Sequence, residues 1–143
     1  NILNALRRIK NVNLTVFGDG PQRNRIEQFI SHYNLKKRVI IKGFVANKII
    51  ISSLKKYDAF VAFHKYHEFP KTIIESILIG LPIILNKNPS SELKEFKKLE
   101  ILWAEDSSDS YLKIMKNFLK NNYNTKKITQ KNLFKLQEII NAR

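Results

Sequence analysis

Short strand-like runs alternate with helical patterns along the chain, and this alternation restricts the fold more than any other feature. β-prone or apolar runs end at turns, and most are followed by segments with apolar residues at helical spacing. The expected strands are 13–17, 39–45, 58–63, 82–85 and 101–104, and the expected helices are 1–10, 22–33, 48–57, 71–79, 90–99, 108–121 and 125–142. Because the connections are short, this order predicts a Rossmann-like α/β domain, with a parallel sheet and helices on both faces.

The length of 143 residues predicts one domain over residues 1–143. The chain has no initiator methionine and no signal peptide, and residues 1–10 resemble the middle of an element. We therefore expect a fragment of a longer two-domain protein. Cysteine is absent, which excludes disulfides, zinc-thiolate sites and cysteine nucleophiles and fits a cytoplasmic location.

The formal net charge is +14, and a field of this sign attracts nucleic acid, anionic membrane or phosphorylated substrates. The lysines are spread widely through a chain rich in Lys, Asn and Ile, so composition alone is an equally good explanation. Phe60 and Phe63 lie in apolar runs, where we expect them to be buried, and no nucleic-acid-binding motif is present. We expect no nucleic-acid partner.

Two apparent motifs fail on their spacing. Gly18-Asp19-Gly20 begins like a dinucleotide-binding fingerprint, but the third glycine position holds Arg23. A tight turn, with Pro21 at the first helical position, is the better interpretation. His64, His67 and Glu68 lack the number and spacing of ligands that a metal site needs, so we expect neither a metal nor a cofactor.

Ligands of a parallel α/β sheet bind beyond the carboxyl ends of the strands, which directs attention to the loops 18–21, 43–47 and 64–71. The third loop leads into a helix through Pro70, which fixes the entry without removing a needed donor. The free main-chain N–H groups of Lys71, Thr72 and Ile73, together with the helix dipole, would suit a diphosphate.

Glu75 lies about one turn inside this helix among isoleucine and leucine residues. A carboxylate in apolar surroundings needs partners, and the two adjacent hydroxyls of a ribose would satisfy it. Because most glutamates are exposed, a place on the solvated stripe of the helix is an equally good interpretation.

Phe69-Pro70, Glu75-Ser76, Gly80 and Pro82-Ile83-Ile84 follow one another in an order and spacing that resemble a known family. This family is glycosyltransferase family 4, the group 1 glycosyl transferases of the GT-B fold, and the similar part is its C-terminal domain. Upstream, the turn at 16–21 and the strand at 39–45 are similar to the same family, so the resemblance covers residues 1–84, with a weaker tail.

The resemblance implies a role for each of these segments. Glu75 would hold the ribose of a nucleotide-sugar donor, and the main chain of Gly43, Phe44 and Val45 would line the base pocket. The diphosphate and sugar would be bound around Phe69, Pro70, Lys71, Thr72 and Ile73, with Gly18 and Gly20 in the neighbouring turn.

The sequence departs from the family at its first acidic position. The family places a glutamate eight residues before the second one, where this chain has His67, and Glu68 comes one residue later. Either His67 replaces the carboxylate or Glu68 moves into its place; we favour Glu68, and a divergent, inactive member is the third alternative. The family's diphosphate-clamping Arg and Lys would precede Asn1, and Pro89-Ser90-Ser91-Glu92 stands in place of its Gly-Gly-x-x-Glu loop.

The resemblance implies a retaining, hexosyltransferase-type enzyme that moves a sugar from a nucleoside diphosphate to a glycan or lipid-linked acceptor. A chain that lacks the other domain should be inactive. The alternatives are a nucleotide-sugar epimerase of the same fold and a non-catalytic module for anionic membrane or nucleic acid. Residues 126–143 form a basic amphipathic pattern that either contacts an anionic membrane or, as we favour, packs on protein.

Overall fold

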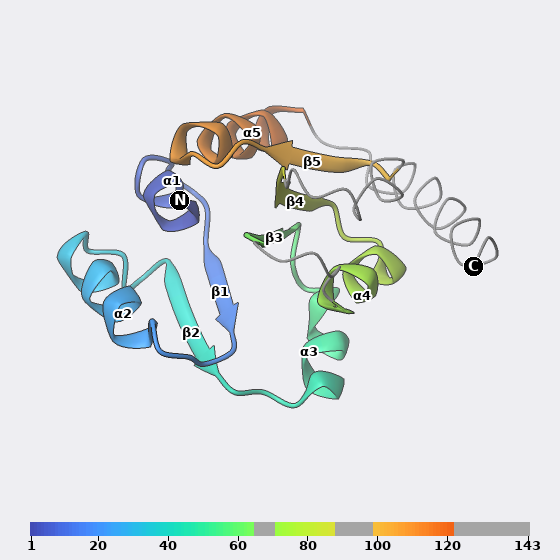
Figure 1. Cartoon of the computed structure of the whole chain (residues 1–143), viewed down its shortest axis with the longest axis horizontal. Helices are drawn as coiled ribbons and strands as arrows, with labels where there is room; N and C mark the ends of the chain where they lie inside the picture. Colours follow the sequence, from blue (N-terminus) through green and yellow to red (C-terminus); the bar gives the residue numbers. More distant parts are fainter. Residues whose placement is uncertain (65–70, 88–98, 122–143) are drawn as a thin grey trace.

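The computed structural model describes residues 1–64, 71–87 and 99–121, in which strands and helices alternate (Figure 1). The elements in chain order are α1 (Ile2–Arg7), β1 (Leu14–Phe17), α2 (Arg23–His32), β2 (Val39–Gly43), α3 (Asn47–Leu54), β3 (Phe60–Ala62), α4 (Lys71–Ile79), β4 (Ile83–Asn86), β5 (Ile101–Ala104) and α5 (Ser108–Lys120).

This order confirms the α/β prediction, and the bounds of α4 and β5 are those expected from the sequence. The expected helices over 90–99 and 125–142 lie outside the described residues, apart from Leu99. The position given to Pro21 is wrong: α2 begins at Arg23, and Pro21 lies in the preceding turn, where the Arg23 N–H donates to the Gly20 carbonyl at 3.0 Å.

Every strand pair in the described part of the chain is parallel, as expected, but the hydrogen bonds divide the strands between two sheets. β1 pairs with β2 in one sheet, and β3, β4 and β5 follow one another in the second. Figure 1 shows β1 and β3 facing each other from the two sheets. The sequence pattern does not distinguish this arrangement from one continuous sheet.

Alternating residues of β4 supply both faces of the three-stranded sheet. Ile83 and Leu85 belong to a cluster with Ile73 and Ile77 of α4, whereas Ile84 belongs to a second cluster that includes Tyr111 of α5. Because successive side chains of a strand point to opposite faces and both faces are covered by helices, Ile83, Ile84 and Leu85 are all apolar.

Helix α1 joins the two sheets because its neighbouring residues pack in different clusters. Ala5 packs with Ile84 and Tyr111, whereas Leu6 packs with residues of α2 and β2. Arg38, just before β2, donates to the main-chain carbonyl of Leu6 in the last turn of α1 at 3.2 Å and to that of Ile9 beyond it at 2.7 Å. A cation at this helix end also suits the helix dipole.

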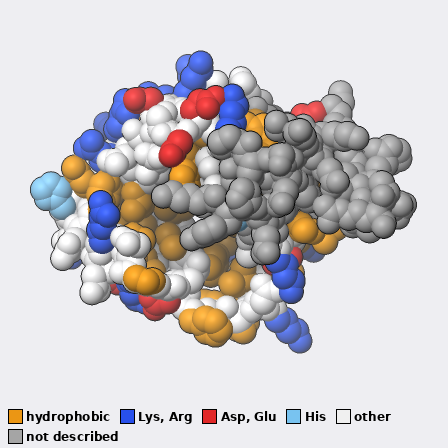
Figure 2. Space-filling view, viewed as in Figure 1, with side chains coloured by type: hydrophobic (Ala, Val, Ile, Leu, Met, Phe, Trp, Pro, Cys, Tyr) orange, Lys and Arg blue, Asp and Glu red, His pale blue; other side chains and the backbone are white. Residues whose placement is uncertain are grey.

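Two aromatic side chains bear on the expectation that the chain has no nucleic-acid partner. Phe63 is 37% exposed, so the expectation that it is buried is wrong, whereas Phe60 packs against the α4 side of the sheet. Lys and Arg side chains are spread around the visible face in Figure 2 and do not gather in one patch. Among the described residues, no helix combines the length and apolar character needed to cross a membrane.

Candidate functional site

The loops that follow β1 and β2 meet at two glycines. The Gly18 N–H donates to the Gly43 carbonyl at 2.8 Å, and the two residues form an isolated bridge. Both have positive φ, +118° at Gly18 and +67° at Gly43, a conformation that side chains disfavour. The structure therefore brings two of the three loops expected to bind a ligand into direct contact.

Arg23 lies beside this contact and connects it to α2. Its guanidinium bonds Asp19 at 2.7 Å and Glu27 at 2.9 Å, and a Cβ added at Gly43 would lie 3.3 Å from its Nη1. The hydrogen bond from Arg23 lowers the pKa of Asp19, and the Gly20 N–H adds to this effect. These charges hold the 18–20 turn against the start of α2.

Phe44 and Val45 carry the chain from Gly43 toward α3. The Phe44 side chain is 89% exposed, and Val45 is partly buried. An aromatic ring this exposed at the carboxyl end of a strand offers an apolar face to a planar ligand. The sequence predicted a role only for main-chain groups here, so the exposed ring is an additional feature.

Glu75 is turned inward and hydrogen-bonded. Its side chain is 11% exposed, and Oε1 accepts a hydrogen bond from Asn47 Nδ2 at 2.9 Å. Lys71 Nζ lies 3.8 Å from the same oxygen. The alternative interpretation of Glu75 as part of a solvated stripe is therefore wrong.

The start of α4 separates into an exposed polar part and a buried anchor. Lys71 is 82% exposed and Thr72 is exposed, whereas Ile73 is fully buried in the cluster with β4. The Ser76 hydroxyl donates to the Thr72 carbonyl at 2.7 Å. Since the Ile73 side chain belongs to the core, only its main chain is available to a ligand.

Asn86 fixes the main chain at the end of β3 and was not singled out from the sequence. This side chain is 4% exposed; its Oδ1 accepts from the His64 N–H at 2.6 Å and its Nδ2 donates to the His64 carbonyl at 2.8 Å. A polar residue that ends the apolar run of β4 was the signal in the sequence.

The remaining predicted site residues, His67, Glu68, Phe69 and Pro70, lie outside the described residues, so their predicted roles stay predictions. Within the ranges 1–64, 71–87 and 99–121, no cluster of three or more potential metal ligands is present.

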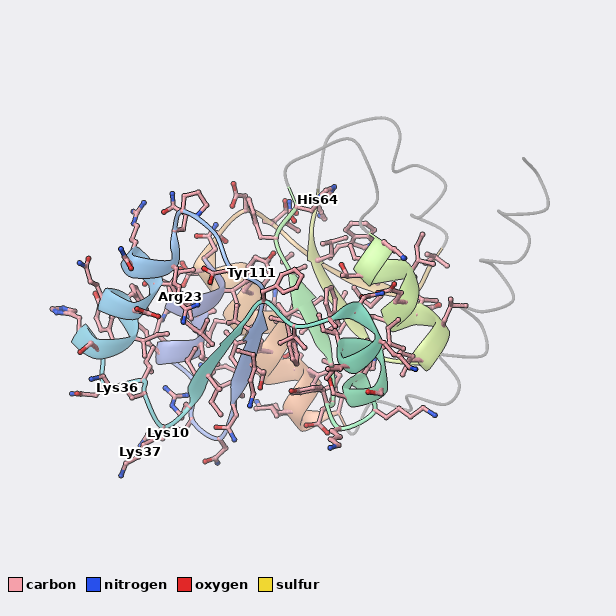
Figure 3. The ribbon with its side chains drawn as sticks, turned by 90° about the horizontal axis from the view of Figure 1, so that it is seen from below. Lys10, Arg23, Lys36, Lys37, His64 and Tyr111 are labelled. Atoms are coloured by element: carbon pink, nitrogen blue, oxygen red, sulfur yellow. The ribbon has the colours of Figure 1, made fainter. Side chains whose placement is uncertain are left out.

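The described residues form two linked groups at the carboxyl ends of the strands. In the first group, the loops after β1 and β2 contact each other through the Gly18–Gly43 hydrogen bond. In the second, Asn47, four residues after Gly43, is hydrogen-bonded to Glu75 on α4. Figure 3 shows His64, which follows β3, at the opposite side of the molecule from Lys10, Lys36 and Lys37. Those three lysines therefore lie away from the end of β3.

The sequence matches the family described as "Glycosyl transferases group 1" over residues 1–135. The chain belongs to the group 1 glycosyl transferases. This result confirms the resemblance inferred from the motifs between Phe69 and Ile84.

Two curated relatives of this group 1 glycosyl transferase chain are glycosyltransferases by name. The chain is 33% identical over 81 residues to a 2-deoxystreptamine N-acetyl-D-glucosaminyltransferase of Niallia circulans, covering 57% of this chain and 21% of the relative. It is 30% identical over 78 residues to an alpha-D-kanosaminyltransferase of Streptomyces kanamyceticus, covering 54% and 20%. The alignments thus span about a fifth of the length of these relatives.

Solved structures share the fold over nearly the whole chain. A sucrose-phosphate synthase from Thermosynechococcus elongatus superposes with a TM-score of 0.79 at 19% identity, covering 96% of this chain and 37% of that protein. HepE of Anabaena, solved in complex with UDP-glucose, superposes with a TM-score of 0.75 at 20% identity, covering 95% and 39%. At such identities the similarity establishes the fold of this group 1 glycosyl transferase chain.

Proposed function

We propose that this chain is the donor-binding domain of a glycosyltransferase that moves a sugar, with retention of configuration, from a nucleoside diphosphate to a glycan or lipid-linked acceptor. The observation that carries the proposal is the inward-turned Glu75, which is 11% exposed and lies in the first turns of α4 near the exposed helix start. The family membership and the HepE complex with UDP-glucose support the same donor class.

The chemistry of the described residues suits a nucleoside diphosphate. The carboxylate of Glu75 can accept hydrogen bonds from two ribose hydroxyls, since Asn47 uses only one of its acceptor positions. The first-turn N–H groups of α4 and the Lys71 ammonium would interact with the diphosphate. The exposed Phe44 ring and the neighbouring main chain would contact the base.

In the transfer reaction, negative charge develops on the departing nucleoside diphosphate. Fixed main-chain donors at the helix start and the cation of Lys71 would stabilise that charge without a resident metal or cofactor, which is electrostatic preorganisation. In this proposal Glu68, or His67 in its place, contacts the donor sugar. The protein would act in the cytoplasm, at the membrane surface when its acceptor is lipid-linked, with no nucleic-acid partner.

The test is a calorimetric titration of the chain with UDP, GDP and inorganic pyrophosphate. We expect one of the two nucleotides to bind, and Glu75→Gln to weaken that nucleotide about 10- to 100-fold because a charged hydrogen-bond acceptor is lost. Pyrophosphate, which has no ribose, should bind both proteins equally.

Asp58→Asn is the matched control, because Asp58 is an exposed carboxylate just before β3, at the amino end of the strand and away from the site. Absence of binding to both nucleotides at millimolar concentration would refute donor binding by this domain. In the longer protein, formation of an isomerised nucleotide sugar without any acceptor would instead indicate an epimerase.

A further inference from the structure

We infer that Asn47 is a positioning residue that orients the Glu75 carboxylate for recognition of the ribose 2′- and 3′-hydroxyls. This inference rests on the proposed function and deepens it, because it names the group that determines how selectively the site distinguishes ribose from deoxyribose. The juxtaposition that carries it is the 2.9 Å hydrogen bond from Asn47 Nδ2 to Glu75 Oε1, between residues 28 positions apart.

The orientation of the Asn47 amide follows from chemistry. An ionised carboxylate only accepts hydrogen bonds, so the Asn47 nitrogen, and not its oxygen, must face Glu75. Asn47 is the first residue of α3, and the preceding residue, Ala46, provides no side-chain cap. The Asn47 side chain hydrogen-bonds Glu75 on the neighbouring helix α4.

The hydrogen bond restricts one oxygen of the carboxylate and leaves the other for a ligand. Both described polar partners, the Asn47 amide and the Lys71 ammonium, lie on the Oε1 side of Glu75. Lys71 is 3.8 Å away and highly exposed, so it constrains the carboxylate less than the 2.9 Å contact from Asn47 does. Oε2, with the second acceptor position of Oε1, is then directed at two neighbouring hydroxyls.

Asn47 also connects the two halves of the site. Between Gly43, which contacts the Gly18 turn, and Asn47 lie only Phe44, Val45 and Ala46. The contact with Glu75 therefore sets the distance between the loop proposed to hold the base and the helix proposed to hold the diphosphate. A nucleoside spans these two parts through its ribose, so ribose recognition depends directly on this bond.

The experiment compares the affinities of the chain for UDP, 2′-deoxy-UDP and inorganic pyrophosphate (or the guanine pair, if GDP is the nucleotide bound). We expect Asn47→Ala to weaken UDP binding about tenfold and to reduce the preference of the protein for UDP over 2′-deoxy-UDP, with pyrophosphate unchanged. Asn47→Gln, which keeps the amide donor, should restore part of this preference. Ser52→Ala, an exposed change on the same helix, is the matched control and should have no effect.

A second variant gives a readout that a merely structural role would not produce. Asn47→Asp places a second carboxylate against Glu75, and two such groups cannot both ionise easily at this distance. UDP binding by Asn47→Asp should therefore be weak at pH 8 and recover toward pH 5, as one carboxyl becomes protonated and donates to the other. Besides Glu75, the charged side chains on α3 and α4 are those of Lys48 and Lys71, and β4 carries no charged side chain.

The outcomes separate the inference from the function on which it rests. If the unaltered chain binds neither UDP nor GDP, the proposed function fails. If the unaltered chain binds and Glu75→Gln binds weakly, but Asn47→Ala keeps the full affinity and the full ribose preference, only the inference is overturned. If UDP binding by Asn47→Asp, measured relative to the unaltered chain at the same pH, does not change between pH 5 and 8, the inference is overturned as well, even if Asn47→Ala proves unstable.

Discussion

Replacing Asn86 by alanine should destabilise the protein more than its position near the end of a short strand would indicate. The side chain makes two hydrogen bonds with the main chain of His64, as acceptor at 2.6 Å and as donor at 2.8 Å. Both bonds disappear in Asn86→Ala, because the alanine side chain has no polar group to replace them. The change therefore removes the connection that holds the end of β3 against the end of β4.

The magnitude follows from these two bonds. Each contributes about 1 kcal/mol to the net free energy of folding. Because Asn86 is 4% exposed, the cavity left by the shorter side chain adds about 1 kcal/mol. We expect a loss of about 2 to 4 kcal/mol, a large share of the roughly 5 to 15 kcal/mol that stabilises a typical domain. In a chain of this size, that loss lowers the melting temperature by about 6 to 12 °C.

Urea denaturation followed by circular dichroism measures this loss, and hydrogen exchange of the His64 amide localises it. Asn34→Gly is a suitable control: Asn34 is exposed, has a φ of +54°, and should tolerate glycine with little change in stability. A change in unfolding free energy below about 0.5 kcal/mol for Asn86→Ala would refute the argument, because it would mean that water replaces both bonds at no cost.

Two further substitutions test backbone strain and a buried hydroxyl. Gly43→Ala places a side chain at a φ of +67° and close to Arg23, so it should lower the free energy of unfolding by about 1 to 2 kcal/mol in urea denaturation. Gly20→Ala, which has open space and no positive φ, should leave that free energy nearly unchanged. Equal effects of the two substitutions would contradict this prediction. Tyr111→Phe removes the 2.8 Å hydrogen bond to the Ala62 carbonyl and should cost about 1 to 2 kcal/mol. Burial raises the pKa of Tyr111 in the folded protein, so the same tyrosine loses its proton at a lower pH in the unfolded chain. The free energy of unfolding should therefore fall as the pH rises above about 10. Tyr111→Phe should lack this part of the alkaline loss, and an alkaline profile unchanged by the substitution would contradict the prediction.

Local sequence patterns determined the elements and the family of this protein. Apolar residues at helical spacing, with Gly80 at the helix end, gave the bounds of α4, and β4 and β5 followed from short apolar runs. The bounds of these helices and strands depend on residues within a few positions of one another, so they can be predicted from the sequence alone. The ordered motif from Phe69 to Ile84 identified the family for the same reason, and the family match confirmed it.

Tertiary structure decided which polar groups meet. Periodicity could not choose between a solvated and an inward-turned Glu75, because the answer depends on Asn47, a partner on another helix. The same holds for Asn86 and the main chain of His64, and for the division of the parallel strands into two sheets. The sequence contains the residues that form these contacts, but packing between distant segments selects the pairs, because a buried polar group takes the partner that the fold brings within reach.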